Sequence, residues 1–547
     1  MTDRASYVHG TSPTPLLGET IGENLRRTVE KHPDREALVA RAQGVRMTYR
    51  ELWEATTRVA RGLIAFGVQK GDRVGIWSPN RFEWVVIQYA SARVGAILVN
   101  INPAYRSAEL EYCLRQSGVS VLLSAHRFRQ TSYTEMIAEV RPRLSDLRVV
   151  MILDADWKML VEGGDHVTDE ALGEREKALE FDDPINIQYT SGTTGFPKGA
   201  TLSHHNVLNN GFFIGEALGY THEDRVCIPV PFYHCFGMVI GNLACTSHGA
   251  TMVIPGEAFD PLAVLEAAQG ERCTSLYGVP TMFIAELDHP RFGEFDLSTL
   301  RTGVMAGSPC PVEVMRNVIS RMHMRAVTIC YGMTETSPVS TQSATDDPLD
   351  KRVGTVGRVH PHVEVKIIDP QTGGVVPRGT PGELCTRGYS VMLGYWNDEE
   401  ATRNAIDRAG WMHTGDLATM DDEGYVNIVG RIKDMIIRGG ENVYPREIEE
   451  YLHQHPKVSE AQVIGVPSER YGEEVMAWVR TKPGESLTAS ELEAHCKGKI
   501  ATYKVPRHWK IVEEFPMTVT GKVQKFKMRE IAVQELGLEV VARVKTA

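Results

Sequence analysis

The stretch "RVGIWSPNRFEWVVIQYASARVGAILV" (73–99) decides the fold class. Its first residues are apolar and β-branched and predict a strand, whereas residues 81–99 have helical apolar periodicity and predict a helix. The same kind of strand-like run returns at 119–125, 147–153 and 250–256, with helix-length segments between the runs. This alternation of strands and helices predicts a largely parallel α/β architecture.

Length and composition limit the classes of protein that fit. A chain of 547 residues exceeds one ordinary domain, and 42% hydrophobic with 24% charged residues is typical of a globular protein. The formal net charge of −11 excludes the general basic surface of a nucleic-acid binder. The N-terminus has no apolar core of a secretory signal. The most apolar segment, 226–245, contains Pro229, Pro231 and Gly237, so we expect a buried strand, turn and helix there and no membrane span.

The cysteines are scattered along the chain. No Cys-x-x-Cys pair occurs, and no cysteine and histidine cluster has the spacing of a zinc finger. This pattern predicts reduced thiols and a cytoplasmic location. The nine positions are Cys113, Cys227, Cys235, Cys245, Cys273, Cys310, Cys330, Cys385 and Cys496.

The pattern of the chain changes near residue 430. The segment "GYVNIVGRIKDMIIRGGENVYPREIEEYLHQHP" (424–456) predicts a strand, a turn, a second strand, a Gly-Gly turn and then a helix. Pro445 suits the first turn of that helix. We therefore predict a large N-terminal domain over residues 1–430, a junction at 431–434, and a small α+β C-terminal domain over 435–547.

Residues 190–199, "TSGTTGFPKG", follow the strand-like "INIQY". Glycines let backbone N–H groups converge on an anion, hydroxyl side chains add donors, and a lysine adds positive charge. The loop is neither a G-x-x-x-x-G-K-[ST] P-loop nor a G-x-G-x-x-G dinucleotide loop. By itself it leaves two interpretations open, a phosphate-binding loop or an exposed flexible loop.

Four further motifs accompany this loop in order. They are "YGMTET" (331–336), "WMHTGDL" (411–417), "GRIKD" (430–434) and "PMTVTGKVQK" (516–525). Together with the glycine-rich loop, and over nearly the whole chain, they resemble the adenylate-forming superfamily of acyl-CoA synthetases, adenylation domains and luciferases. The resemblance implies layered α/β subdomains in the large domain, a mobile C-terminal domain, and the use of ATP, Mg²⁺ and CoA.

The resemblance also implies a role for each matching residue at the phosphates. Thr334 would contact the adenylate phosphate, and Glu335 would hold Mg²⁺, which prefers carboxylate oxygen. An ordinary surface lysine is the alternative for Lys198. The residues implied at the β- and γ-phosphates of ATP are Thr190, Ser191, Gly192, Thr193, Thr194 and Lys198.

The nucleoside has its own set of implied contacts. Tyr331 would stack on adenine, beside Gly332, and Asp416 and Arg431 would bind the ribose hydroxyls. A carboxylate suits that role because it accepts several hydrogen bonds, although a turn-capping aspartate is the simpler alternative for Asp416. The turn "AGSPCP" (306–311) resembles the adenine side of the site and adds Gly307 and Ser308.

Lys522 is the principal catalytic candidate. In the family the matching lysine bridges the attacking carboxylate and the α-phosphate. Residues 497–529 hold nine Lys or Arg against two Glu, so a solvated basic surface is the rival explanation. Lys433 matches the hinge about which the C-terminal domain rotates between the two half-reactions. The residues matching the pantetheine channel are Arg438, Gly439 and Gly440, for which a plain hairpin turn is the alternative.

The segment "PFYHCFG" (231–237) bears on the acid. Amino-acid-activating relatives usually keep an aspartate here, and this chain has none, which favours an apolar acid. Together with "NPAYR" (102–106) and "AGSPCPVEVM" (306–315), the chain resembles medium-chain acyl-CoA synthetases. The candidates for the wall of the acyl pocket are Tyr233, His234, Phe236, Gly237 and Met238, with a core histidine as the alternative for His234.

Several alternatives stay open at this point. Short-chain, branched, aryl and long-chain acids fit the same motifs, and a carrier-protein thiol could replace CoA. A catalytically silent nucleotide-binding protein is the non-enzyme alternative, but such a protein is expected to lose Lys522, Glu335 or the glycine-rich loop, and all three are present. The expected partner is a small carboxylic acid, and a homodimer is left open.

Overall fold

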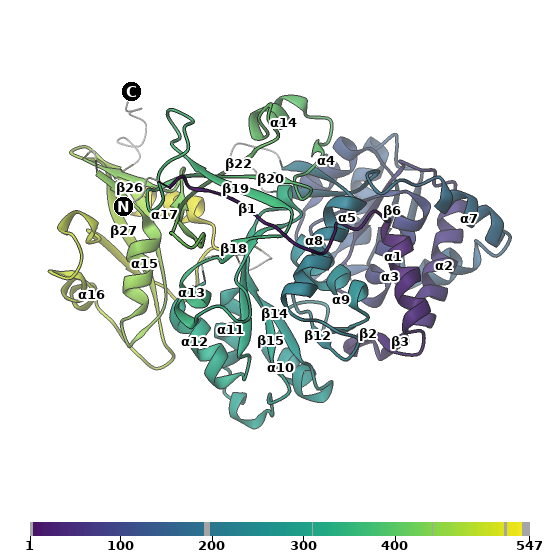
Figure 1. Ribbon diagram of the computed structural model, residues 1–547, viewed down its shortest axis with the longest axis horizontal. Helices are drawn as coiled ribbons and strands as arrows, with labels where there is room; N and C mark the ends of the chain where they lie inside the picture. The colour runs from purple at the N-terminus through teal and green to yellow at the C-terminus, as the bar shows by residue number, and fades with distance from the viewer. Residues whose placement is uncertain (1–3, 191–196, 309, 440, 519–521, 539–547) are drawn as a thin grey trace.

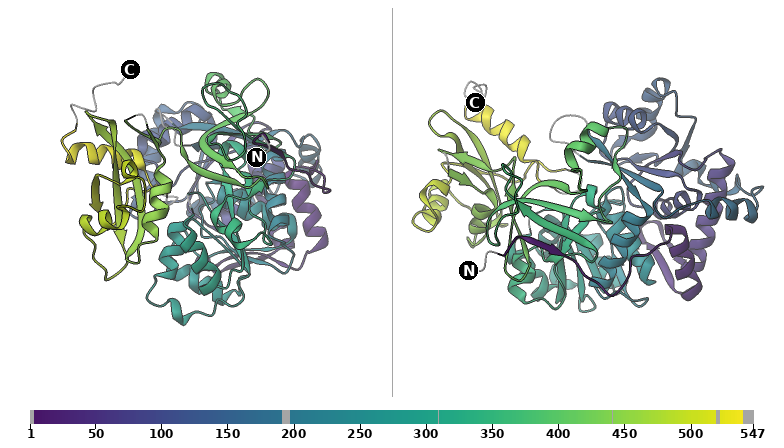
Figure 2. Two further views of the ribbon diagram at one scale, coloured as in Figure 1. Left: turned by 60° about the vertical axis from the view of Figure 1, so that its left-hand side comes forward. Right: turned by 45° about the horizontal axis from the view of Figure 1, so that its top comes forward.

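The computed structural model describes residues 4–190, 197–308, 310–439, 441–518 and 522–538, with the side chain of Asn442 excepted. It is a mixed α/β protein with a large N-terminal part and a small C-terminal part (Figure 1). In both views of Figure 2 the small part, coloured yellow-green to yellow, lies at one end of the molecule. The predicted fold class is confirmed in these respects.

The first sheet of the large part has seven strands. Its central strands are parallel, and β10 and β11 form an antiparallel pair with Thr190 opposite Lys198. The glycine-rich loop therefore joins two neighbouring strands of this sheet. The order is β21 (Gly394–Tyr395), β11 (Lys198–Ser203), β10 (Pro184–Thr190), β5 (Ile97–Asn100), β4 (Arg73–Trp77), β6 (Val119–Ser124) and β9 (Val149–Ile152).

The second sheet has nine strands and is parallel from β16 to β2. The two edge strands are β18 and β3, and each is antiparallel to its neighbour. The order is β18 (Arg358–Val359), β17 (Val339–Gln342), β16 (Ala326–Gly332), β15 (Thr302–Ala306), β14 (Ser275–Gly278), β12 (Arg225–Cys227), β13 (Thr251–Ile254), β2 (Glu36–Ala40) and β3 (Val45–Thr48).

A third, antiparallel sheet of five strands completes the large part. The N-terminal strand β1, drawn in purple in Figure 1, lies along β19 although more than 350 residues separate them. The order is β1 (Tyr7–His9), β19 (Val363–Ile368), β20 (Gly382–Gly388), β22 (Met412–Met420) and β23 (Val426–Arg431). A short hairpin of β7 (Arg127–Phe128) and β8 (Thr131–Ser132) stands apart.

Helices form layers on the faces of the first two sheets. The largest apolar cluster lies between these sheets and includes the fully buried Trp84. The helices that supply it are α1 (Ile21–Lys31), α2 (Tyr49–Ala65), α3 (Phe82–Val94), α8 (His204–Ala217), the π-helix Phe236–Leu243 and α9 (Ala244–His248). Burial of apolar area on this scale is the main force that holds the layers together.

The outer faces are covered by other helices. On the seven-stranded sheet these are α4 (Ser107–Ser117) and α5 (Tyr133–Val140). The helices α6 (Leu153–Glu162) and α7 (Asp169–Lys177) instead pack on α2 and α3 and add to the cluster between the sheets. On the nine-stranded sheet they are α10 (Pro261–Gly270), α11 (Pro280–Leu287) and α12 (Val312–Arg321). The short helices α13 (Leu349–Gly354) and α14 (Glu399–Ala405) lie in connections between strands.

The C-terminal part has its own sheet and its own apolar clusters. Its strands, in order, are β25 (Glu441–Val443), β24 (Ile436–Arg438), β27 (Gly472–Thr481) and β26 (Val458–Ser468), and β28 (His508–Ile511) pairs with β27. Its helices are α15 (Pro445–His453), α16 (Ala489–Cys496) and α17 (Lys525–Glu535). The chain leaves the third sheet at Arg431 and enters this sheet at Ile436, so the predicted junction at 431–434 spans the change of sheet.

One local prediction is wrong. The segment 81–99 is not a single helix, because α3 ends at Val94 and Ile97–Asn100 form the buried strand β5. Gly95 has φ +71, a left-handed conformation that suits glycine and ends the helix there. The other strand-like runs of the N-terminal region are strands, as predicted.

The apolar segment 226–245 contains most of β12, a turn and the π-helix Phe236–Leu243. The prediction of a buried strand, turn and helix is confirmed. No helix within the described ranges is long and apolar enough to cross a membrane. All nine cysteines belong to the described residues, and each is buried and unpaired.

Candidate active site at the junction of the sheets

The predicted nucleotide-binding residues gather at the ends of strands. Tyr331 and Gly332 end β16, Gly307 follows β15, and Thr190 ends β10. The carboxyl ends of parallel strands are the usual place for ligands in open α/β sheets. The third sheet adds Asp416 from β22.

Asp416 lies at the centre of the predicted ribose contacts. Its Oδ2 accepts a hydrogen bond of 2.7 Å from the Tyr331 hydroxyl, and its Oδ1 accepts one of 3.1 Å from Nε of Arg431. Burial raises the pKa of Asp416, whereas the guanidinium and the hydroxyl favour the ionised form. A carboxylate has about four acceptor sites, so capacity for two further hydroxyl donors is left. The arrangement is suited to a ribose diol.

Glu335 is almost completely buried, with 5% exposure. Its Oε1 accepts a hydrogen bond of 2.8 Å from the hydroxyl of Tyr395. Among the described residues, Oε2 has no hydrogen-bond partner, so this oxygen is available to a cation or a donor. Lys198 Nζ lies 5.1 Å from the centroid of the Tyr395 ring. Tyr395 thereby connects the predicted phosphate-binding lysine with the predicted metal ligand.

Sequence reasoning missed Tyr395. It lies on the two-residue strand β21, where antiparallel pairing sets it opposite Ala200 on the strand that Lys198 begins. Its segment, "LGYWND", carries no motif that distinguishes it from an ordinary connection. Only the pairing of strands distant in sequence brings it to Glu335.

Lys522 reaches this site from the C-terminal part. A Cβ placed on Gly307 would lie 3.8 Å from Cε of Lys522. Desolvation, followed by the nearby Arg431, lowers the pKa of Lys522, while the carboxylates of Asp416 and Glu335 oppose that shift. The structure thus brings together the predicted catalytic lysine, the predicted ribose carboxylate and the predicted metal ligand. That grouping is not what a solvated basic surface would produce.

The predicted acyl-site residues begin at the turn before the π-helix. Nδ1 of His234 accepts a hydrogen bond of 3.1 Å from the backbone N–H of Phe236, which leaves the ring proton on Nε2. Burial, and then the Lys522 ammonium, lower the pKa of His234 to about 3, so the ring is neutral. Gly237 is required by packing, because a Cβ there would lie 2.5 Å from the carbonyl oxygen of Pro231.

Two amides that sequence reasoning missed fix the neighbouring side chains. Sδ of Met238 accepts hydrogen bonds from the side-chain amides of Asn100, at 3.2 Å, and Gln188, at 3.1 Å. The thiol of Cys235 donates to Oε1 of Gln188 at 3.1 Å. Tyr233 is buried, and its backbone carbonyl accepts a hydrogen bond of 3.0 Å from the side-chain amide of Asn100. Isolated amides on buried strands give no sequence signal of such a role.

Other predicted residues are not gathered at this site. Arg438 pairs with Glu474 and lies 4.3 Å above the Tyr471 ring, all within the C-terminal part. Lys433 lies in the turn between β23 and β24, and Gly439 (φ +60) follows β24. Ser308, in contrast, directly follows Gly307 at the site. The predicted residues that lie outside the described ranges are Ser191, Gly192, Thr193, Thr194 and Gly440.

Two protein-family models match this chain, one in its N-terminal part and one in its C-terminal part. The model of a family described as AMP-binding enzyme matches residues 25–396, and that of the AMP-binding enzyme C-terminal domain matches residues 447–522. The chain belongs to the AMP-binding enzyme family. The predicted membership of the adenylate-forming superfamily is confirmed.

Individual relatives extend over almost the full chain. The putative acyl-CoA synthetase YngI of Bacillus subtilis is 49% identical, covering 96% of this chain and 99% of that protein. The mitochondrial medium-chain acyl-CoA ligase ACSF2 of Danio rerio is 47% identical, with 97% and 91% covered. The crystal structure of the anthranilate CoA ligase AuaEII with anthranoyl-AMP has a TM-score of 0.84 at 27% identity, with 96% and 99% covered. The chain is an enzyme of the acyl-CoA synthetase class, as its sequence predicted.

Proposed function

We propose that this enzyme activates a medium-chain fatty acid with ATP, forming acyl-AMP and pyrophosphate, and then transfers the acyl group to CoA, releasing AMP. The observation that carries the proposal is the position of Lys522, whose Cε would lie 3.8 Å from a Cβ on Gly307 and whose ammonium interacts with the charges of Asp416 and Glu335. A cation from the C-terminal part at this position supports a site where nucleotide and acid meet.

In the first half-reaction a carboxylate oxygen attacks the α-phosphorus and the bond to the pyrophosphate oxygen breaks. Two anions must approach each other, so a positioned ammonium both orients them and stabilises the developing charge. Lys522 is assigned this role, and Thr334, at the turn after β16, is assigned a contact with the α-phosphate. Thr190 and Lys198 are assigned to the leaving pyrophosphate.

The nucleoside half of ATP is held by the contacts described above. Tyr331 offers its ring to adenine while its hydroxyl remains bonded to Asp416. Asp416 retains acceptor capacity for the ribose hydroxyls, and Arg431 favours the ionised form of this carboxylate against the effect of burial on its pKa. The structure therefore fits an adenosine moiety at this position.

Glu335 fits a magnesium ion. Its buried carboxylate has Oε2 without a partner among the described residues, and a hard cation held by one carboxylate and by phosphates is the common arrangement for Mg²⁺. When bound, the ion would neutralise phosphate charge. Tyr395 holds the other oxygen of the carboxylate and so fixes the orientation of Oε2.

The second half-reaction needs a different partner for the acyl-AMP. The thiolate of CoA attacks the acyl carbon, and AMP leaves. Lys522 must then withdraw, and the turn around Lys433 is the assigned hinge because the chain changes sheets there. Rotation would bring Arg438 and Gly439 to the pantetheine arm. The small domain would then have two working positions, one for each half-reaction.

The class of acid is proposed from the residues predicted to line the acyl pocket, 231–238. No carboxylate is present among residues 231–238, and the neutral His234 offers only a hydrogen-bond donor. An alkyl chain suits such a wall better than an amine or a second carboxylate. The ACSF2 relative, named a medium-chain ligase, favours a medium-chain acid.

The decisive experiment is CoA-dependent AMP release, measured across straight-chain acids of graded length with an aryl acid alongside. We expect the highest kcat/KM with a medium-chain acid and an acyl-CoA product in equal amount to AMP. Acid-dependent pyrophosphate release without acyl-CoA would point to another acceptor, such as a carrier-protein thiol. ATP binding without AMP release from any acid would refute the proposal. A cytoplasmic location and a homodimer stay predictions.

A further inference from the structure

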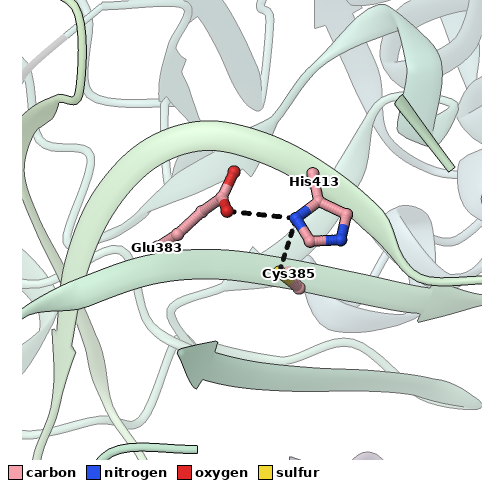
Figure 3. Close-up of side chains that lie close together, drawn as sticks. All are labelled: Glu383, Cys385 and His413. Atoms are coloured by element: carbon pink, nitrogen blue, oxygen red, sulfur yellow. Dashed lines mark hydrogen bonds and ion pairs between the residues drawn. The ribbon is translucent and has the colours of Figure 1, made fainter. Parts of the chain in front are cut away.

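A second cluster of ligand-type side chains lies on the third sheet. Glu383 and Cys385 are on β20 and His413 is on β22, and one potential ligand atom of each lies within 4.8 Å of the other two (Figure 3). Nδ1 of His413 is 3.0 Å from Oε2 of Glu383 and 3.6 Å from Sγ of Cys385. The proposed catalytic chemistry uses none of the three.

The backbone explains how two strands bring three ligands together. Cys385 and His413 are directly opposite each other in the antiparallel pair. Glu383 precedes Cys385 by two residues and so shares its face of the strand. The register shifts between these two residues, and the extra residues on β22 include Gly415, whose φ is +69. This bulge lets His413 and Asp416, three residues apart, serve different sites.

The two separations from Nδ1 of His413 suit a tetrahedral ion, and the third lies within 4.8 Å. Bonds of about 2.0–2.1 Å to nitrogen or oxygen and about 2.3 Å to sulfur, at tetrahedral angles, put N and S roughly 3.6 Å apart and N and O roughly 3.4 Å apart. The observed N···S separation needs no change. The N···O separation needs to open by roughly 0.4 Å, which the flexible Glu383 side chain accommodates.

The surroundings supply the outer contacts that metal ligands usually have. Gly415 donates its N–H to Oε1 of Glu383 at 3.2 Å, which leaves Oε2 directed at His413. Oδ2 of Asp407 lies 3.8 Å from Nε2 of His413. Lys366, which lies over Trp411 close by, offsets part of the negative charge, whereas Arg387 over the same ring is paired with Glu364.

We propose that Glu383, Cys385 and His413 form a binding site for a borderline-soft divalent cation, Zn²⁺. Thiolate, imidazole and carboxylate together select such an ion over Mg²⁺. Binding forms an S–Zn bond as the S–H bond of Cys385 breaks and its proton passes to solvent. The His413 side chain is 32% exposed, which provides an access route and room for water as the fourth ligand. The site is separate from Glu335 and does not depend on which acid is activated.

The test uses the full chain, stripped with a chelator, desalted and dialysed against Zn²⁺ in excess Mg²⁺. We expect one tightly bound Zn²⁺ more in the parent than in Cys385→Ser. The matched control, Cys496→Ser, changes a buried cysteine of the C-terminal part and should bind as the parent does. Equal zinc in parent and Cys385→Ser, or equal loss in both cysteine variants, would overturn the proposal.

Co²⁺ provides a readout that structural damage does not imitate. A thiolate-to-cobalt charge-transfer band should appear in the parent and in Cys496→Ser and be absent from Cys385→Ser. Should Cys385→Ser fail to fold, Asp407→Asn replaces it. That variant should keep the band but weaken Co²⁺ affinity roughly 10–100-fold, as the loss of an outer partner does. No band in the parent, or unchanged affinity in Asp407→Asn, would count against the site.

Discussion

Replacing Lys522 with alanine should separate the two half-reactions. The ammonium lies with Asp416 and Glu335 in a partly buried site, where a preorganised charge is effective. Loss of one group that stabilises charge developing in a transition state lowers the rate by roughly 10²–10³, or about 2.7–4 kcal/mol. We therefore expect Lys522→Ala to slow acyl-AMP formation by at least roughly 10²-fold. Thioester formation from acyl-AMP made beforehand should continue at close to the parental rate.

The pKa of Lys522 adds a second signature. Desolvation and Arg431 lower this pKa, and the charged form is the active one. Acyl-AMP formation should therefore decline as pH rises through a value below that of an ordinary lysine. Thioester formation from acyl-AMP should lack this alkaline decline. In Lys522→Arg the guanidinium stays charged throughout, so the decline should disappear even where the rate is lower.

The assay is pyrophosphate exchange for the first half-reaction and acyl-CoA formation from purified acyl-AMP for the second. Lys527→Ala is the matched control, because it removes an exposed lysine of the same basic segment. Equal loss of both half-reactions in Lys522→Ala would refute the assigned role. An equal loss in Lys527→Ala would favour a general effect of the basic segment.

Four further predictions follow from the same structure. Glu335→Gln should raise the Mg²⁺ concentration needed for half-maximal pyrophosphate exchange, because the buried carboxylate loses its charge; an unchanged Mg²⁺ requirement would remove the metal assignment. Asp416→Asn should raise the KM for ATP roughly 10–100-fold, since hydrogen bonds to a charged group contribute about 1.5–3 kcal/mol; a normal KM would contradict the ribose role. Lys433→Pro should lower overall turnover more than pyrophosphate exchange, and equal turnover would reject the hinge. Trp84→Ala should lower the free energy of unfolding by about 3–5 kcal/mol in denaturant titration, and a loss under 1 kcal/mol would mean that this core repacks.

Much of the fold could be predicted because apolar periodicity directly reflects burial in strands and helices. The error at 81–99 shows the limit of that reasoning. A buried helix and a buried strand both consist of continuous apolar residues, so periodicity does not separate α3 from β5. Gly95 was the available signal, since a glycine near the end of a helix favours its termination.

The site shows a similar division. Asp416, Glu335 and Lys522 stand in recognisable motifs and could be selected from the sequence. Tyr395 and Gln188 could not, because each acts through pairing between strands that no local pattern specifies. The cluster at Cys385 was invisible for the same reason. Its ligands face each other across two strands 28 residues apart, and no spacing typical of zinc fingers results.

The bond between Tyr331 and Asp416 links the nine-stranded sheet to the five-stranded sheet, two units that also share an apolar cluster. A nucleotide bound there would contact the nine-stranded sheet, the five-stranded sheet and, through Lys522, the C-terminal part. ATP should therefore act as a non-covalent crosslink, and its binding energy adds directly to the docking of these units. A ligand at a concentration of about a hundred times its dissociation constant raises the free energy of unfolding by about 2.7 kcal/mol. The substrate-free enzyme is accordingly the form in which these units are held together least firmly.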